Sequence, residues 1–191
     1  MATKKSEETG AMARIPYPEP DNLEKEVRAQ LEGLAPLNIF LMLAHGGGLL
    51  RSFVDLGTYL LFKTRLDPVL REIAIIRVGV LSASKYEVFQ HERIGRQLGM
   101  KSDLLNAIHD GPESPCLTPL QGLVIRYTDE VVRNVRASDG LFHLLKDQLS
   151  IRPLQELTVT IGYYMMVCRF LENFEVDLEE DGQTEGLKVR R

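Results

Sequence analysis

Apolar side chains recur at spacings of three and four residues along most of the chain, a period typical of amphipathic α-helices. Glycine, proline and capping residues interrupt this pattern, so each interruption indicates a helix boundary. The two-residue alternation that would indicate strands is missing throughout the sequence. The pattern therefore predicts an all-α protein, with helical regions over residues 22–44, 49–62, 67–81, 86–98, 102–108, 118–135, 138–149 and 152–178.

Three of these boundaries carry specific signals. The glycines at 46–48 interrupt an apolar run and predict a break or a tight helix junction. Asp67 before Pro68 combines a capping residue with a proline at the first helical position, which is a start signal. Gly99 stands where a helix C-terminal cap is expected.

The two ends of the chain differ from its middle because they are polar and lack helical spacing. Prolines at positions 16, 18 and 20 exclude a helix there and favour an extended arm on the surface. We therefore divide the chain into a flexible N-terminal arm (1–21), one helical domain (22–179) and a flexible C-terminal tail (180–191).

Two stretches of the helical domain resemble each other. Residues 57–72 (GTYLLFKTRLDPVLRE) match residues 140–156 (GLFHLLKDQLSIRPLQE) when one inserted residue is allowed, and an apolar helix follows each. Two duplicated helical hairpins about a pseudo-twofold axis would bury apolar faces that neither hairpin could bury alone. Chance similarity between amphipathic helices is the alternative.

Composition narrows the class of protein. With 44% hydrophobic and 26% charged residues, this 191-residue chain is typical of a globular domain with one core. A net charge of −4 without a basic block argues against nucleic acid, and no apolar run reaches membrane-spanning length. Cys116 and Cys168 form no disulfide framework. The first twelve residues lack the apolar core of a secretory signal, so we expect a cytoplasmic protein.

The candidate catalytic group consists of Glu72, Ser84, Glu87 and His91. Ser84, Glu87 and His91 stand at i, i+3 and i+7, so they share one face of a helix. The preceding helix could place the Glu72 carboxylate beside them. Burial raises a carboxylate's affinity for a proton, and a neighbouring carboxylate keeps an imidazole charged, so this group suits acid–base exchange near neutral pH.

The same residues also allow a purely structural interpretation. Ser84-Lys-Tyr-Glu87 is the capping-box pattern, in which serine and glutamate satisfy backbone donors at the start of a helix. Glu87 and His91 would then be an ordinary i,i+4 pair on a solvated surface. Spacing alone favours this structural interpretation, and the surrounding sequence tips the balance the other way.

The run from Leu70 to Gly99 (LREIAIIRVGVLSASKYEVFQHERIGRQLG) resembles the central motif of the carboxymuconolactone decarboxylase family, which shares its fold with alkyl hydroperoxidase D. Leu37-Asn-Ile-Phe with His45 is similar to the upstream helix of that family, and residues 156–170 are similar to its closing helix. The resemblance thus covers about residues 34–176. It implies an all-α, alkyl hydroperoxidase D-like domain that assembles into homo-oligomers, commonly trimers or hexamers.

The peroxidases of this fold carry a glutamate, then C-x-x-C, then a histidine four positions after the second cysteine. Glu72 and His91 fall on the glutamate and histidine positions, whereas Ser84 and Glu87 fall on the two cysteine positions. Peroxide reduction through this motif needs an attacking thiolate and a resolving thiol, which serine and glutamate cannot supply. The resemblance points instead to the cysteine-free branch, which moves a proton without a metal or an organic cofactor.

In that branch, the resemblance makes His91 the main acid or base at the carbon that loses carbon dioxide. Glu72 or Glu87 would orient and charge the imidazole. Ser84 or Tyr86 would hold a substrate oxygen.

Five further residues are candidates for substrate binding. Arg71, Arg77 or Lys85 would anchor a substrate carboxylate. His45, before the three glycines, could line a pocket, although a histidine at a helix C-terminus is also favoured by the helix dipole. Phe40 could form an apolar pocket wall, or it could be an ordinary core residue.

Three functional hypotheses remain open at this point. The first is a cofactor-independent decarboxylase-like lyase or isomerase that acts on a small carboxylated or aromatic-derived compound. The second is a peroxidase-related antioxidant protein, and the third is a non-catalytic helical oligomer that only binds a ligand. Two carboxylates and an imidazole could also hold a divalent ion. No second histidine stands in an H-x-x-x-H or E-x-x-H pattern nearby, so we expect no metal. The resemblance implies that the protein uses no organic cofactor.

Overall fold

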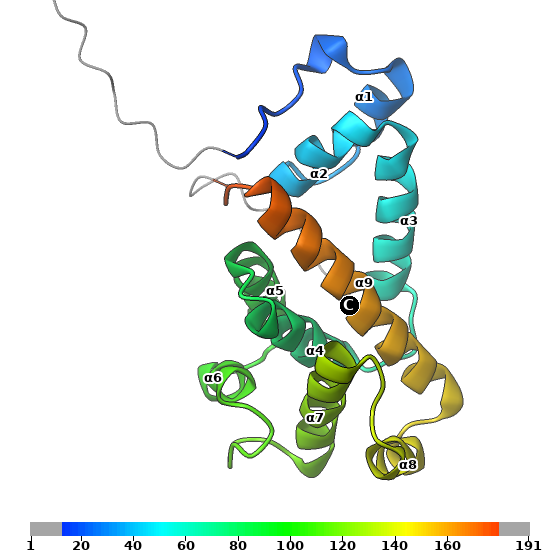
Figure 1. Cartoon of the computed structure of the whole chain (residues 1–191), viewed down its shortest axis with the longest axis vertical. Coiled ribbons are helices and arrows are strands. Elements are labelled where there is room, and N and C mark those ends of the chain that lie inside the picture. Colours follow the sequence, from blue (N-terminus) through cyan, green and yellow to red (C-terminus); the bar gives the residue numbers. More distant parts are fainter. Residues whose placement is uncertain (1–12, 180–191) are drawn as a thin grey trace, which may run out of the picture.

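The structure, a computed structural model, describes residues 13–179, and this part of the chain is all-α, as the apolar spacing predicts (Figure 1). The described residues form nine α-helices and two short 3-10 helices: η1 (Pro20–Asn22), α1 (Lys25–Glu32), α2 (Asn38–Leu43), η2 (Ala44–Gly46), α3 (Gly48–Phe62), α4 (Pro68–Leu81), α5 (Lys85–Gln97), α6 (Ser102–Asp110), α7 (Pro119–Asn134), α8 (Asp139–Gln148) and α9 (Ile151–Phe174).

Helix α4 is the centre of the fold. It packs against α5, α6, α7 and α9, and every residue from Leu70 to Gly79 is buried. The predicted start signal is confirmed, because the Asp67 side chain accepts hydrogen bonds from two backbone N–H groups of the first turn and Pro68 follows it. A helix surrounded by other helices must be apolar on all sides, and α4 is apolar apart from a few charged residues that find buried partners.

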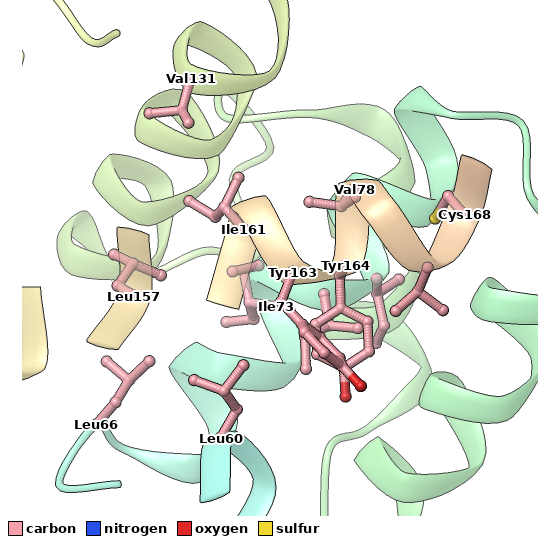
Figure 2. Close-up of a cluster of buried hydrophobic side chains, with 14 of the residues drawn as sticks. Leu60, Leu66, Ile73, Val78, Val131, Leu157, Ile161, Tyr163, Tyr164 and Cys168 are labelled. Atoms are coloured by element: carbon pink, nitrogen blue, oxygen red, sulfur yellow. The ribbon is translucent and has the colours of Figure 1, made fainter. Parts of the chain in front are cut away.

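Helix α9 runs diagonally through the molecule and supplies much of the core (Figure 1). Figure 2 shows its side chains, among them Leu157 and Ile161, gathered with Leu60 of α3 and Ile73 of α4. All four of these side chains are at most 1% exposed. Burial of this apolar surface is the main favourable contribution to folding, and it fixes α3, α4 and α9 relative to one another.

Helices α4 and α5 approach each other closely after a short turn over residues 82–84. At Gly79 a Cβ atom would lie only 2.9 Å from Val88 Cγ2 of α5, so a larger residue would push the two helices apart. Ala83 in the turn adopts a φ of 54°, in the left-handed region that few residues other than glycine occupy. This tight junction brings Glu72 on α4 beside His91 on α5.

Two predicted helical regions differ from the structure. The region over 22–44 is two helices, α1 and α2, because Gly33 and Pro36 interrupt it, and the connecting loop lines a cavity. The last helix ends at Phe174 rather than near residue 178, since Glu175 adopts a left-handed φ of 49°. The predicted break at residues 46–48 is confirmed, because η2 ends there and α3 begins.

We call residues 175–179 the C-terminal strap. They lie against the described part of the predicted N-terminal arm, where Arg14 N–H donates to the Phe174 carbonyl at 2.9 Å and Ala13 N–H donates to the Asp177 carboxylate at 3.1 Å. The flexibility predicted for residues 1–12 and 180–191 lies outside the described residues.

The proposed duplication would relate the junction of α3 and α4 to the junction of α8 and α9, and it stays a prediction. Within residues 13–179, no helix combines the length and the apolar character needed to cross a membrane.

Candidate active site

A cavity of about 270 Å³ lies between the α1–α2 loop and helices α2, α3, α5 and α9. Its walls are mostly apolar, and α5 contributes four of its polar side chains. Such a hollow, apolar with a few convergent polar groups, is the usual form of a small-molecule site. The lining residues are Gly33, Leu34, Ala35, Leu37, Ile39, Phe40, Phe53, Val54, Gly57, Thr58, Leu61, Phe62, Tyr86, Glu87, Gln90, His91, Tyr163, Tyr164 and Val167.

His91 stands at the cavity wall within a row of alternating charges. Its Nδ1 lies 2.7 Å from Glu72 Oε2, and its Nε2 lies 3.1 Å from Glu87 Oε1. Behind Glu72, Arg71 Nε donates to Glu72 Oε1 at 3.0 Å. All four residues are at most 5% exposed, so the row is shielded from water and its interactions are strong.

This environment keeps His91 charged. Burial lowers the pKa of His91, but the carboxylates of Glu87 and Glu72 outweigh that effect and raise its pKa to about 10. The imidazole is therefore an imidazolium at neutral pH, whose Nδ1–H donates to Glu72 and whose Nε2 lies at ion-pair distance from Glu87. The row of Arg71, Glu72, His91 and Glu87 then carries two positive and two negative charges, so each buried charge has a partner of opposite sign.

Glu72 and Glu87 have different roles in this geometry. Glu72 is fully buried behind His91, held by Arg71, and does not line the cavity. Glu87 lines the cavity, and its buried Oε1, which lies 3.1 Å from His91 Nε2, has no hydrogen-bond partner. Glu72 is thus placed to orient the imidazole, whereas Glu87 is the carboxylate of the two that lines the cavity. The edge of the His91 ring also meets Tyr164, with the ring centroids 4.8 Å apart.

The purely structural interpretation of these residues is wrong. Ser84 makes no side-chain cap hydrogen bond at the start of α5, so no capping box forms. Glu87 and His91 are 3% and 5% exposed, so they are not a surface pair. Ser84 itself is fully buried, does not line the cavity and has a hydroxyl without a hydrogen bond. It is therefore not positioned to hold a substrate oxygen.

Tyr86 lines the cavity as predicted, but its hydroxyl is already occupied. It donates to Glu179 Oε1 in the C-terminal strap, and Ile39 N–H lies 3.4 Å from the same hydroxyl oxygen. Burial and the Glu179 carboxylate raise the pKa of Tyr86 well above its ordinary value, so the phenol keeps its proton. Gln90, one turn along α5, donates to Glu179 Oε2.

The structure places three of the other candidate substrate contacts outside the cavity and one in its wall. His45 is exposed and its Nε2 lies 2.9 Å from the Pro16 carbonyl oxygen, in a separate hollow. Lys85 is exposed and does not line the cavity. Arg77 does not line the cavity either, since it is bound to Asp129 of α7 by bonds of 2.6 and 2.9 Å. Phe40 lines the cavity as expected.

Sequence reasoning missed Gln90, Tyr164 and Glu179. Gln90 could have been found, because it follows Tyr86 by four positions on the face of α5 that was already singled out. Glu179 could not, because 93 residues separate it from Tyr86 and no local pattern connects them.

The two cysteines of the described region are both unpaired. Cys116 is exposed and lies in a separate hollow with Gly99, outside the cavity, whereas Cys168 is buried in α9. Burial, followed by the Glu87 charge, raises the pKa of Cys168 to about 12. Residues 13–179 contain no cluster of three or more His, Cys, Asp and Glu side chains arranged to hold a metal ion.

Neither a family model nor a curated protein sequence matches this chain. Solved structures do resemble it. An uncharacterized peroxidase-related protein from Ralstonia eutropha JMP134, described as an alkyl hydroperoxidase D core, superposes with a TM-score of 0.80 at 16% identity, over 91% of this chain and 95% of that one. An uncharacterized peroxidase-related protein from Silicibacter sp. TM1040 gives 0.76 at 16% identity, over 96% and 98% of the two chains. A protein of unknown function from Agrobacterium tumefaciens gives 0.65 at 20% identity, over 69% and 90%.

The protein therefore has the alkyl hydroperoxidase D fold, as the resemblance of residues 70–99 predicts. At this level of identity the comparisons establish the fold, and the chemistry has to be argued from the site itself.

Proposed function

We propose that this protein is a cofactor-independent lyase or isomerase of the carboxymuconolactone decarboxylase type, with His91 as proton donor and Glu87 as proton acceptor. The observation that carries the proposal is the buried imidazolium of His91, held between Glu72 and Glu87 at the wall of an apolar cavity. A charged proton donor and a carboxylate with an unused oxygen, side by side and shielded from water, are what proton transfer to and from carbon requires.

The proposed decarboxylation breaks the bond between a substrate carbon and its carboxylate, and the electron pair moves into a conjugated enolate. His91 then delivers its Nε2 proton to the carbon, and solvent restores the imidazolium. An imidazolium with a pKa of about 10 is a weak acid, so it transfers its proton only to a strongly basic acceptor. An enolate carbon is such an acceptor. In an isomerisation, Glu87 would remove one proton while His91 supplies another.

The substrate class follows from the cavity. Its volume of about 270 Å³ and its walls, which include Phe40, Phe53 and Tyr164, suit one small planar compound, carboxylated or derived from an aromatic ring. We propose that the ligand is such a small molecule. Homo-oligomerisation and a cytoplasmic location stay predictions.

A peroxidase-related function is the second candidate, and the names of the Ralstonia and Silicibacter proteins favour it. The chemistry of this chain gives it less support. The positions that the C-x-x-C motif would occupy hold Ser84 and Glu87, and a thiol with a pKa of about 12 at Cys168 supplies little thiolate at neutral pH. A cavity that binds a ligand without chemistry is the third candidate, and a screen for turnover separates it from the first.

The proposal is tested by a screen of unsaturated lactone acids and keto acids in D₂O, followed by mass spectrometry of the products. We expect a turned-over acid to give a product that carries one deuterium at the carbon that lost carbon dioxide or took up the proton. Because no thiol takes part, a variant with Cys116→Ser and Cys168→Ser should turn over the same acid at an unchanged rate. Peroxide turnover that disappears in this double variant, with no acid turned over, would contradict the proposal and support the peroxidase function.

A further inference from the structure

The Glu179 carboxylate accepts hydrogen bonds from three residues, two of which, Tyr86 and Gln90, line the cavity. Three donors surround its carboxylate: the Tyr86 hydroxyl and the Asn38 N–H to Oε1, the latter at 2.7 Å, and the Gln90 side-chain amide to Oε2. We call these three groups the carboxylate cradle. Glu179 is 7% exposed, and Tyr86 and Gln90 are 5% and 6% exposed, so these three side chains are screened from water, whereas Asn38 is half-buried. A buried carboxylate is stable only with such a set of donors.

The cradle adjoins the proposed proton donor, because Tyr86 and Gln90 line the same cavity as Glu87 and His91. None of the arginines and lysines predicted to anchor a substrate carboxylate lines that cavity. His91 is the cation at its wall, and both of its ring nitrogens already face carboxylates. Among the residues that line or border the cavity, the cradle is therefore the group best suited to hold a ligand carboxylate.

The charge balance favours replacement of the Glu179 carboxylate by a ligand carboxylate over binding of the two carboxylates side by side. The row from Arg71 to Glu87 is neutral overall, so Glu179 adds one negative charge to this region. A ligand carboxylate beside Glu179 would add a second charge of the same sign in a medium of low dielectric constant, which is costly. A ligand carboxylate that replaces Glu179 leaves the total charge unchanged and regains the same three hydrogen bonds.

Glu179 is also held in a segment that can be displaced without breaking a helix. The C-terminal strap has no regular secondary structure after α9, and its other polar contacts are partly buried or exposed. The Arg14–Glu175 ion pair, for example, joins two side chains that are more than half exposed, and such pairs contribute little. Release of Glu179 therefore leaves α4, α5 and α9 in place.

We propose that the carboxylate cradle is the substrate-carboxylate subsite, and that Glu179 fills it until a carboxylate ligand displaces it. The subsite narrows the substrate class of the proposed function to small planar monocarboxylates. The word substrate rests on the proposed function, whereas carboxylate binding does not. Carboxylate binding can be measured without turnover, so displacement of Glu179 and proton transfer by His91 are tested by separate experiments.

Isothermal titration calorimetry of the full chain with benzoate tests this displacement, with benzamide as the uncharged control ligand. Glu179→Ala empties the cradle, so benzoate should bind this variant about tenfold more tightly than it binds the wild type, which must first release its own carboxylate. Glu175→Gln removes an exposed charge from the same strap and should change benzoate affinity by less than about twofold. Benzamide should bind all three proteins alike. Benzoate binding that is equal in the wild type and Glu179→Ala, or absent from both, overturns the proposal.

Hydrogen–deuterium exchange of the wild type provides a second measurement that does not depend on how well Glu179→Ala folds. Saturating benzoate should speed the exchange of the strap amides over residues 177–179, because this part of the strap loses its anchor, whereas the Val176 amide stays bonded to the Leu171 carbonyl of α9. The Asn38 amide should stay protected, since it then donates to benzoate instead of Glu179. Strap exchange that is unchanged or slower with benzoate bound contradicts displacement of Glu179.

Discussion

Replacing His91 with glutamine should lower the turnover of the acid identified in the D₂O screen by about 10²- to 10⁴-fold, the usual contribution of a positioned general acid. Glutamine is close to histidine in size and can still donate a hydrogen bond to Glu72 or Glu87, but it has no proton to transfer. The measurement is kcat/KM of the wild type and of His91→Gln with the same substrate.

The matched control for this variant is His109→Gln. His109 is an exposed histidine on α6 whose Nε2 lies 2.8 Å from Glu92, so this change also removes an imidazole from a carboxylate, but outside the cavity. We expect kcat/KM of His109→Gln to stay within about twofold of the wild type, as is usual for surface changes. Circular dichroism establishes that both variants are folded. A folded His91→Gln protein with wild-type kcat/KM would remove His91 from the mechanism.

The free energy of unfolding should fall as the pH rises from about 6.5 to about 10, because the folded protein holds a proton on His91 that the unfolded chain releases. The pKa of His91 is raised in the folded state, so the extra stability is fully present below pH 6.5 and is lost as the pH passes through 10. A shift of this size corresponds to an upper bound of about 5 kcal/mol. Urea denaturation at a series of pH values measures it.

Other groups also titrate between pH 6.5 and pH 10, so the contribution of His91 is obtained from the difference in unfolding free energy between the wild type and His91→Gln. The gap in unfolding free energy between the wild type and His91→Gln should narrow steadily from pH 6.5 to pH 10, because glutamine does not titrate. If the two curves ran parallel across this range, His91 would have the same pKa in the folded and the unfolded chain.

Much of the fold could be predicted because its helices carry local signals. Asp67 before Pro68 marked the start of α4, and the glycines at 46–48 marked the junction before α3. The end of α9 was missed because Val176 and Leu178 continue the apolar pattern past Phe174. Glu175 nevertheless turns the chain there, and residues after it bind the N-terminal arm, a long-range contact that helical spacing does not encode.

The charged residues of the candidate site could be predicted from the sequence, but most of its substrate contacts could not. The shared helix face of Ser84, Glu87 and His91 and the resemblance around residues 70–99 identified the candidate group, and the structure brings Glu72, Glu87 and His91 together. The substrate contacts were harder, because spacing shows which residues share a helix face but not which face meets the cavity. Lys85 and Tyr86 are neighbours in sequence, yet Lys85 is exposed and Tyr86 is buried against Glu179.

NMR of ¹⁵N-histidine-labelled protein observes directly whether His91 is an imidazolium in the cavity wall. The ring nitrogens of His91, assigned by comparison with His91→Gln, should have the chemical shifts of the charged form at neutral pH and should change to those of the neutral form only near pH 10. A His91 ring that loses its proton near pH 6.5, the ordinary value for histidine, would mean that Glu72 and Glu87 do not hold the charge, and the proposed proton donor would not exist in this form.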